Sequence, residues 1–311
     1  MKLFSKGFLI ALFFFGIYAC GEKDSSLPKN VSDVKPVSVT VKDRNLSEDF
    51  KNYWYDGTAE ITSYQLTQAR YGELREGTAV NIFVTEDFLP EIQVKADKVS
   101  EENIPVLKFN QTKDFNTGIY PYSIMTSTFS PLRSTAHALK VSHSMQEWCG
   151  QAYVQLNNRK DFEIRSHSYF QGEADAEFNL QKTWLETELW NLIRINPEEL
   201  PTGDLQVIPS FEFLRMSHQE TKAYEVFASL KQGDSLTSYK LMYPELKREL
   251  ILYFNSTFPF EIEKWEETNA PSNSEGEGLT TTAVKMKRIK TAYWQQKSKN
   301  FESLRDSLGL K

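Results

Sequence analysis

The stretch AEITSYQLTQARYGELREGTAVNIFVT, residues 59–85, decides the fold class of this 311-residue chain. Both ends of the stretch are rich in the β-branched and aromatic residues that favour strands. Val80, Ile82 and Val84 recur at every second position, so they share one face of an extended segment. Two glycines lie between the two ends. The stretch therefore predicts a β-hairpin.

The same pattern continues outward from this hairpin, with short alternating segments separated by polar turns. One run breaks it: residues 183–195 place Trp184, Leu189 and Ile193 at helical spacing before Asn196-Pro197 ends the helix. A short helix capped by Ser47 and a polar helix at 296–308 are also predicted. The predicted strands are 59–69, 79–85, 93–96, 105–111, 120–128, 136–146, 151–157, 162–169, 206–208, 211–215, 223–230, 236–243, 249–255, 260–266 and 280–289.

This element order predicts a mainly β fold built on one large antiparallel sheet. The sheet could form a half-barrel, a barrel or a sandwich, with a central short helix and a C-terminal helix. We expect residues 46–311 to form a single β-rich domain. Two β subdomains meeting near 170–205 are the alternative. Residues 269–278 are mostly polar and are expected to form a mobile loop.

The first residues predict export and lipid attachment. Lys2 and Lys6 precede an apolar stretch that ends at Cys20, which is the pattern of a secretory signal. Ile17-Tyr18-Ala19-Cys20 resembles the lipobox of bacterial lipoproteins, in which the cysteine is acylated and the preceding bond is cut. The resemblance implies a signal peptide at 1–19 and a protein that is anchored to the membrane through acyl chains on Cys20. It implies a place in the cell envelope, with the outer membrane as the expected site and the membrane face undecided.

Residues 20–45 are rich in Ser, Lys, Asp, Pro and Val and lack aromatic residues. Such a composition predicts a flexible tether between the lipid and the folded body. The net charge is −6, and the sequence contains no stretch of clustered Lys and Arg residues. A nucleic-acid partner is therefore not expected. With Cys20 acylated, Cys149 has no partner for a disulfide. The fold must then depend on its hydrophobic core.

Catalytic motifs are weak in this sequence. Cys149 is one candidate nucleophile, although Glu147 beside it would raise its pKa, and a buried inert thiol is the expected interpretation. Glu173, Asp175 and Glu177 would line one face of a strand and could act as a carboxylate pair. The expected interpretation is a solvated strand or loop.

Metal and cofactor motifs are absent from the sequence. His137 and His143 would share the face of one predicted strand, ~20 Å apart, which is too far to hold one metal. No metal site and no cofactor are therefore expected.

Aromatic residues give a broader signal. Tyr120, Tyr122 and Trp265 belong to groups of aromatic side chains that could line the concave face of a curved sheet. Such a face would bind a lipid or peptide. The alternative is that these residues build the core.

Three segments, Tyr53–Tyr64 (YWYDGTAEITSY), Gln68–Glu73 (QARYGE) and Phe83–Phe88 (FVTEDF), resemble a family of Bacteroidetes envelope lipoproteins of unassigned role. Members often carry the label "septum formation inhibitor Maf". The pyrophosphatases of that name begin with a Ser-x-Ser-Pro-Arg-Arg motif. Here only Ser130-Pro131-Leu132-Arg133 is similar to it, within a β-rich region, which argues against nucleotide hydrolysis.

Residues 239–244, 250–254 and 258–262 are similar to the closing strands of LolA-like half-barrels, which hold acyl chains in a concave sheet. The leading hypothesis is therefore a non-enzymatic envelope lipoprotein that binds an apolar ligand or a protein partner, such as an envelope protein, through an aromatic sheet face. A hydrolase acting on envelope glycans or peptides is one alternative. A scaffold subunit of an outer-membrane assembly is another.

Overall fold

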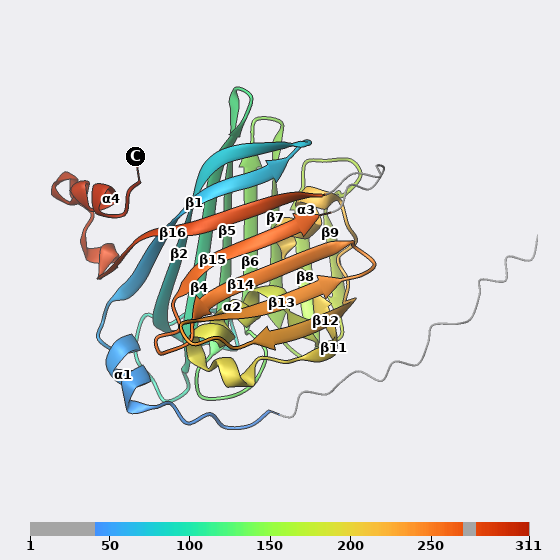
Figure 1. Ribbon diagram of the computed structural model, residues 1–311. Coiled ribbons are helices and arrows are strands. Elements are labelled where there is room, and N and C mark those ends of the chain that lie inside the picture. The colour runs from blue at the N-terminus through green and yellow to red at the C-terminus, as the bar shows by residue number, and fades with distance from the viewer. Residues whose placement is uncertain (1–40, 270–277, 311) are drawn as a thin grey trace, which may run out of the picture. The chain divides into compact units, whose positions relative to one another are not determined.

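The computed structural model describes residues 41–269 and 278–310. The predicted signal peptide, the lipidation site Cys20, most of the tether and the loop at 270–277 lie outside these ranges. The folded body contains a single sheet that includes every strand (Figure 1). The strands are β1 Ala59–Arg70, β2 Glu73–Leu89, β3 Val94–Lys95, β4 Ile104–Thr117, β5 Tyr120–Pro131, β6 Lys140–Glu147, β7 Gly150–Asn158, β8 Phe162–Ser168, β9 Ala176–Leu180, β10 Trp184–Leu185, β11 Gly203–Ile208, β12 Tyr224–Lys231, β13 Leu236–Tyr243, β14 Arg248–Asn255, β15 Ile262–Asn269 and β16 Leu279–Thr291.

The strand order is β10-β11-β12-β13-β14-β15-β16-β1-β2-β4-β5-β6-β7-β8-β9, with β3 added beside β2. Neighbouring strands are antiparallel except β10 and β11, which run parallel. The prediction of one large, mainly antiparallel sheet is therefore confirmed. The sheet is open, with β9 and β10 at its edges, so the half-barrel is the arrangement that it matches. Strands from before and after residues 170–205 belong to this one sheet.

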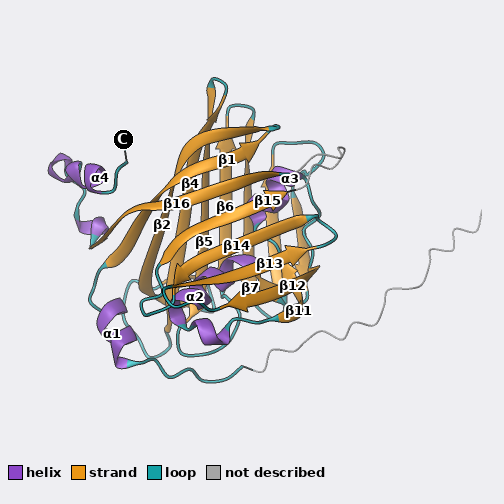
Figure 2. Ribbon diagram, in the orientation of Figure 1, coloured by secondary structure: helices purple, strands orange, loops and turns teal. Residues whose placement is uncertain are grey.

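The helices are short: α1 Glu48–Trp54, α2 Glu186–Ile195, α3 Phe211–Ser217 and α4 Ser303–Ser307, with single 3-10 turns at Pro197–Glu199, Tyr293–Gln295 and Lys299–Phe301. Ser47 caps α1 as predicted, because its Oγ accepts a hydrogen bond from the Phe50 backbone N–H. The central helix α2 lies inside the curve of the sheet (Figure 2), and every one of its residues is buried.

The core forms between α2 and the inner face of the sheet. Trp190 of α2 stacks on Phe109 of β4, with ring centroids 5.4 Å apart, and meets the edge of Trp265 of β15 at 5.2 Å. Phe109 in turn stacks on Phe83 of β2 at 4.7 Å. The concave aromatic face that the sequence predicts therefore packs against the helix and is filled by it.

Polar contacts also hold α2 against the sheet. Glu186 at its beginning pairs with Arg248 of β14, and Arg194 near its end pairs with Glu60 of β1. Both pairs are at most 3% exposed. Between them, the Asn191 side-chain amide donates to the backbone of the sheet. The two buried charges of the helix and the Asn191 amide nitrogen thus have partners, as burial requires.

Three predicted elements differ from the structure. Residues 211–215 are predicted as a strand, but they form α3. Ser210 explains the difference, because its Oγ accepts from the Phe213 N–H and caps a helix. In place of the predicted helix at 296–308, the structure has the 3-10 turn Lys299–Phe301 and the short helix α4.

The third difference concerns the histidine-bearing strand. Strand β6 begins at Lys140, so His137 lies in the preceding loop, and the predicted sharing of one strand face by His137 and His143 is wrong.

The body also begins earlier than predicted. We call residues 42–44 the N-terminal strap. Its backbone pairs with residues 133–135, for example through Arg44 N–H to Arg133 O at 2.9 Å. The last residues of the predicted tether therefore belong to the body, whose expected boundary at residue 46 was a few residues late.

Candidate functional site

One large cavity lies at the open side of the sheet. It has a volume of about 680 Å³, and strands β7, β8 and β9 form one wall. Helix α3 and residues 218–222 form the other wall. We call it the seam cavity, because it lies between the edge strand β9 and the segment that leads back into β12. Along the chain only residues 181–183 separate the two edge strands.

The inner surface of the seam cavity is mainly apolar. Val154 of β7 and the alternate residues Phe178 and Leu180 of β9 contribute from the sheet. Phe211 and Leu214 contribute from α3. The alternation along β9 follows from the period of two in a strand, so Glu177 and Asn179 lie on the opposite face. Concave apolar walls with a few polar groups are typical of small-molecule sites.

Glu173, Arg215 and His218 form a linked cluster that we call the rim, and Glu220 and Lys222 also line the cavity. Glu173 Oε1 lies 2.8 Å from Arg215 Nη1 and 2.9 Å from His218 Nδ1. Glu173 Oε2 also accepts from Ser168 Oγ at 3.3 Å. Arg215 and His218 come from α3 and its C-cap, where His218 adopts the left-handed conformation with φ of 52°. A non-glycine residue in this conformation is uncommon and marks a constrained position.

Arg215 is the most buried charge of this rim. Its side chain is 7% exposed, and its guanidinium carbon lies 4.3 Å from the centre of the Phe170 ring. Its Nε–H is buried and has no hydrogen-bond partner among the described residues. The Arg215 charge also acts on His143 in β6. Burial first, then Lys113 and Arg215, lower the pKa of His143 to about 3, so its imidazole stays neutral.

Of the three carboxylates predicted as one strand face, only Glu173 reaches the seam cavity. The reason is a turn at 170–174, in which Ala174 has a φ of 35° and the Ala174 N–H donates to Phe170 O. The alternation of a strand begins only at β9, so that prediction was wrong. Asp175 pairs instead with His167, and Glu177 with Arg165, both at exposed positions.

Cys149 lies in the turn between β6 and β7 and is exposed, contrary to the expected burial. Its backbone N–H donates to Glu147 Oε2 at 2.6 Å. A side-chain hydrogen bond between the thiol and Glu147, together with the Glu147 charge, raises the pKa of the Cys149 thiol, as predicted from their adjacency. A raised pKa makes the thiolate scarce at neutral pH, which disfavours a nucleophilic role.

The predicted aromatic ligand residues lie away from the seam cavity. Tyr122 and Trp265 are at most 2% exposed and belong to the core, where Tyr122 stacks on Phe115. Tyr120 is partly exposed and lies near Trp148 at the tip of the neighbouring hairpin. Arg215 and His218, which form the rim, were not predicted. The signal that could have revealed them is the Ser210 cap, since it turns residues 211–217 into a helix.

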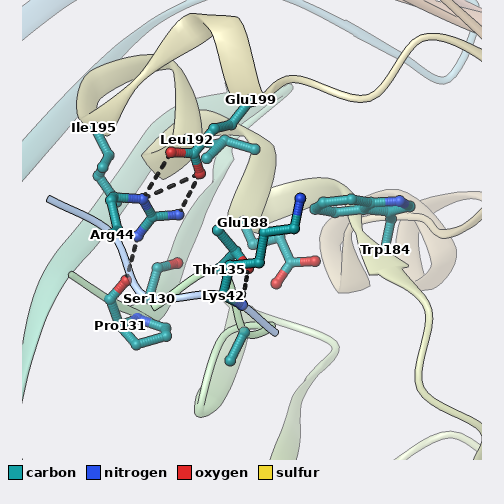
Figure 3. Close-up of a pocket in the computed structure, with 11 residues that line it drawn as sticks. Lys42, Arg44, Ser130, Pro131, Thr135, Trp184, Glu188, Leu192, Ile195 and Glu199 are labelled. Carbon is teal, nitrogen blue, oxygen red and sulfur yellow. Dashed lines mark hydrogen bonds and ion pairs between the residues drawn. The ribbon is translucent and has the colours of Figure 1, made fainter. Parts of the chain in front are cut away.

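A second cavity, of about 240 Å³, lies beneath the N-terminal strap. Figure 3 shows Arg44 and Glu199 on one side of it and Trp184 with Glu188 on the other. Arg44 makes a forked contact with Glu199, with distances of 2.7 to 3.1 Å, and also donates to Pro131 O. The Arg44 guanidinium therefore holds the strap to the body and is satisfied within the chain.

Glu188, on the other side of this strap cavity, is also satisfied internally. Its carboxylate contacts His137 Nδ1 at 2.7 Å and accepts from the Ala138 and Leu185 backbone N–H groups. Burial by itself lowers the pKa of His137, but the charge of Glu188 outweighs burial and leaves that pKa raised. Two charged groups of the strap cavity, Arg44 and Glu188, are thus paired within the chain.

The His137–Glu188 pair predicts a pH dependence of stability. Because the folded-state pKa of His137 lies above that of the unfolded chain, ~6.5, its contribution is full below about pH 6.5 and is lost as the pH rises through the folded-state value. The difference in unfolding free energy between wild type and His137→Gln should be larger at about pH 6 than at about pH 9. Urea unfolding at both pH values checks this, and a difference that does not change with pH would contradict it.

Within residues 41–269 and 278–310, no three His, Cys, Asp or Glu side chains lie together as metal ligands would. No helix in the same ranges is long and apolar enough to cross a membrane. His218 is held by a carboxylate in the manner of a general base. Along the described chain, however, His218 Nδ1 is in polar contact only with Glu173 and Arg215, and no hydroxyl or thiol nucleophile is bonded to this histidine.

Comparison with known proteins found no protein-family model, no curated protein and no solved structure that matches this chain.

Proposed function

We propose that this protein is a membrane-anchored envelope lipoprotein that binds an apolar ligand in the seam cavity. The observation that carries the proposal is the cavity itself, whose apolar walls end at the charged rim of Glu173, Arg215 and His218. Its volume of about 680 Å³ falls within the ~300–1,000 Å³ of small-molecule sites. The proposed binding surface is this cavity, because α2 occupies the aromatic concave face.

The anchoring part of the proposal rests on the sequence. Lys2 and Lys6, the apolar stretch that follows and Cys20 fit a lipoprotein signal. Acyl chains on Cys20 would hold the protein at the membrane, where apolar ligands are concentrated. The expected location is the cell envelope, with the anchor in the outer membrane.

The two alternatives find less support. A hydrolase would need a nucleophile bonded to His218, whereas the nearby Ser168 hydroxyl donates to Glu173 instead. Asp175 and Glu177 pair with His167 and Arg165 at exposed positions. A scaffold would need a flat aromatic patch, and most of the predicted aromatic residues are in the core. Ligand binding is therefore the function that the geometry favours.

Filling the seam cavity should remove the ligand. Ala176 of β9 faces the cavity, and a Trp side chain at this position would occupy the space between β9 and α3. We expect Ala176→Trp to lower the lipid that co-purifies with the full chain by about tenfold, a loss of ~1.4 kcal/mol in binding free energy, because the indole would occupy space that the ligand needs. The measurement is mass spectrometry of organic extracts from protein purified in detergent.

The matched control is Asn179→Trp, which adds the same side chain to the opposite, exposed face of the same strand. It should retain the lipid content of the wild type. The proposal is wrong if wild-type protein carries no lipid after mild purification, or if the two variants lose it equally.

A further inference from the structure

We infer that the ligand of the seam cavity is a single-chain amphiphile with a carboxylate head, and that Arg215 binds this head. The inference rests on the proposed function and adds the chemical class of the ligand. It comes from three observations: the hydrogen-bonding groups of the rim that have no partner within the chain, the burial of these groups, and the position of the apolar wall beside them.

The spare groups at the rim are donors. Glu173 already accepts from Arg215, His218 and Ser168, so its carboxylate is largely saturated. Arg215 carries five N–H donors, of which only those on Nη1 have partners among the described residues. Its unpartnered Nε–H belongs to a side chain that is 7% exposed. The rim therefore has spare donors and no spare acceptor of its own, and the other carboxylate of the lining, Glu220, lies 3.8 Å from Lys222.

Burial makes a charged acceptor the best match. A buried N–H without a partner costs about 1–3 kcal/mol, and a bond to a charged acceptor recovers more than a bond to a neutral one. The planar guanidinium presents its free donors as a fork that fits the two oxygens of a carboxylate. An ammonium head would instead meet the Arg215 charge in a poorly solvated place.

The apolar wall begins directly beside Arg215. Leu214 precedes it in α3, and Phe211 lies one turn earlier on the same helix. Phe178 and Leu180 of β9 line the cavity from the opposite wall. A ligand with its head at Arg215 would therefore place an alkyl chain along α3 between two apolar surfaces.

The test compares three ligands with the same chain and different heads: hexadecanoate, hexadecanol and hexadecyltrimethylammonium. Each competes with radiolabelled hexadecanoate for the full chain in a nonionic detergent. We expect wild type to prefer hexadecanoate over hexadecanol by about tenfold, the size of a charge-assisted hydrogen bond, and to bind the ammonium least. Arg215→Met should bind hexadecanoate no better than hexadecanol.

Arg215→Lys, which keeps the charge without the fork, should retain part of the preference. The matched control is Arg165→Met, which removes an arginine from the outer face of β8 and should leave the preference intact. Hexadecanol binding by Arg215→Met shows that the variant is folded. Equal binding of hexadecanoate and hexadecanol by wild type, or a preference that survives Arg215→Met, would overturn the inference and leave the proposed function standing. Failure of all three ligands to bind would overturn both.

Discussion

Replacing Glu60 by alanine should lower the free energy of unfolding by about 3–5 kcal/mol, the usual cost of breaking a buried ion pair from one side. Glu60 is fully buried in β1, and Arg194 of α2 is 1% exposed. Their two contacts measure 2.5 and 2.8 Å. Burial raises the pKa of Glu60, but the charge and hydrogen bonds of Arg194 outweigh burial and leave that pKa lowered.

The cost arises from what the substitution leaves behind. Without Glu60, the Arg194 guanidinium stays charged between the Trp54 and Phe83 rings, 5.0 and 4.7 Å away, with Pro259 O as its remaining hydrogen-bond acceptor. A loss of this size is a large part of the ~5–15 kcal/mol that stabilises a domain.

Urea unfolding of the full chain measures this effect. The double variant Glu60→Leu/Arg194→Met should be far more stable than Glu60→Ala, because it leaves no unpaired charge. Lys240→Ala is the exposed control, since the Lys240–Glu249 pair is 41% and 35% exposed, and should cost about 0–1 kcal/mol. A Glu60→Ala cost no larger than that of the control would contradict the role assigned to the buried pair.

Replacing Cys20 by serine should abolish lipid attachment and processing. Under the proposed function this cysteine receives the acyl chains, and a serine hydroxyl at that position does not provide the thiol. The variant should keep residues 1–19 and incorporate no labelled palmitate. Intact-mass measurement and fractionation of the envelope report both outcomes.

Cys149→Ser is the matched control, because it removes the other cysteine of the chain, which lies exposed in the β6–β7 turn. It should mature and fractionate as wild type does. Normal maturation of Cys20→Ser would refute the lipoprotein part of the proposal without affecting the seam cavity.

The sheet was predictable because its signals are local. Alternation in segments such as 79–85 and turns with Gly or Asn recur along the chain, and each predicts a strand or a hairpin by itself. Gly77 shows the limit of this reasoning. It was expected in a turn, but it lies inside β2, where a Cβ would collide with the backbone oxygen of Asp114 in β4. Only the neighbouring strand reveals why a glycine is needed there.

The seam cavity could not be predicted, because its parts are far apart in sequence. Glu173 comes from a turn before β9, whereas Arg215 and His218 come from α3. Residues 211–215 are predicted as a strand, and the cap by Ser210 makes them part of a helix instead. The buried pairs of α2 were hidden in the same way, since a helix with Glu186 and Arg194 would ordinarily expose them.

The most direct test of the proposed function is to locate a bound ligand by photocrosslinking. A hexadecanoate analogue with a diazirine on its chain would be bound to the full chain, irradiated, and its adducts mapped by peptide mass spectrometry. The seam cavity predicts adducts on β7, β9 and α3, among them Val154, Phe178 and Leu214, which unlabelled hexadecanoate suppresses. Adducts spread over exposed residues such as Trp148, or insensitive to competition, would contradict it.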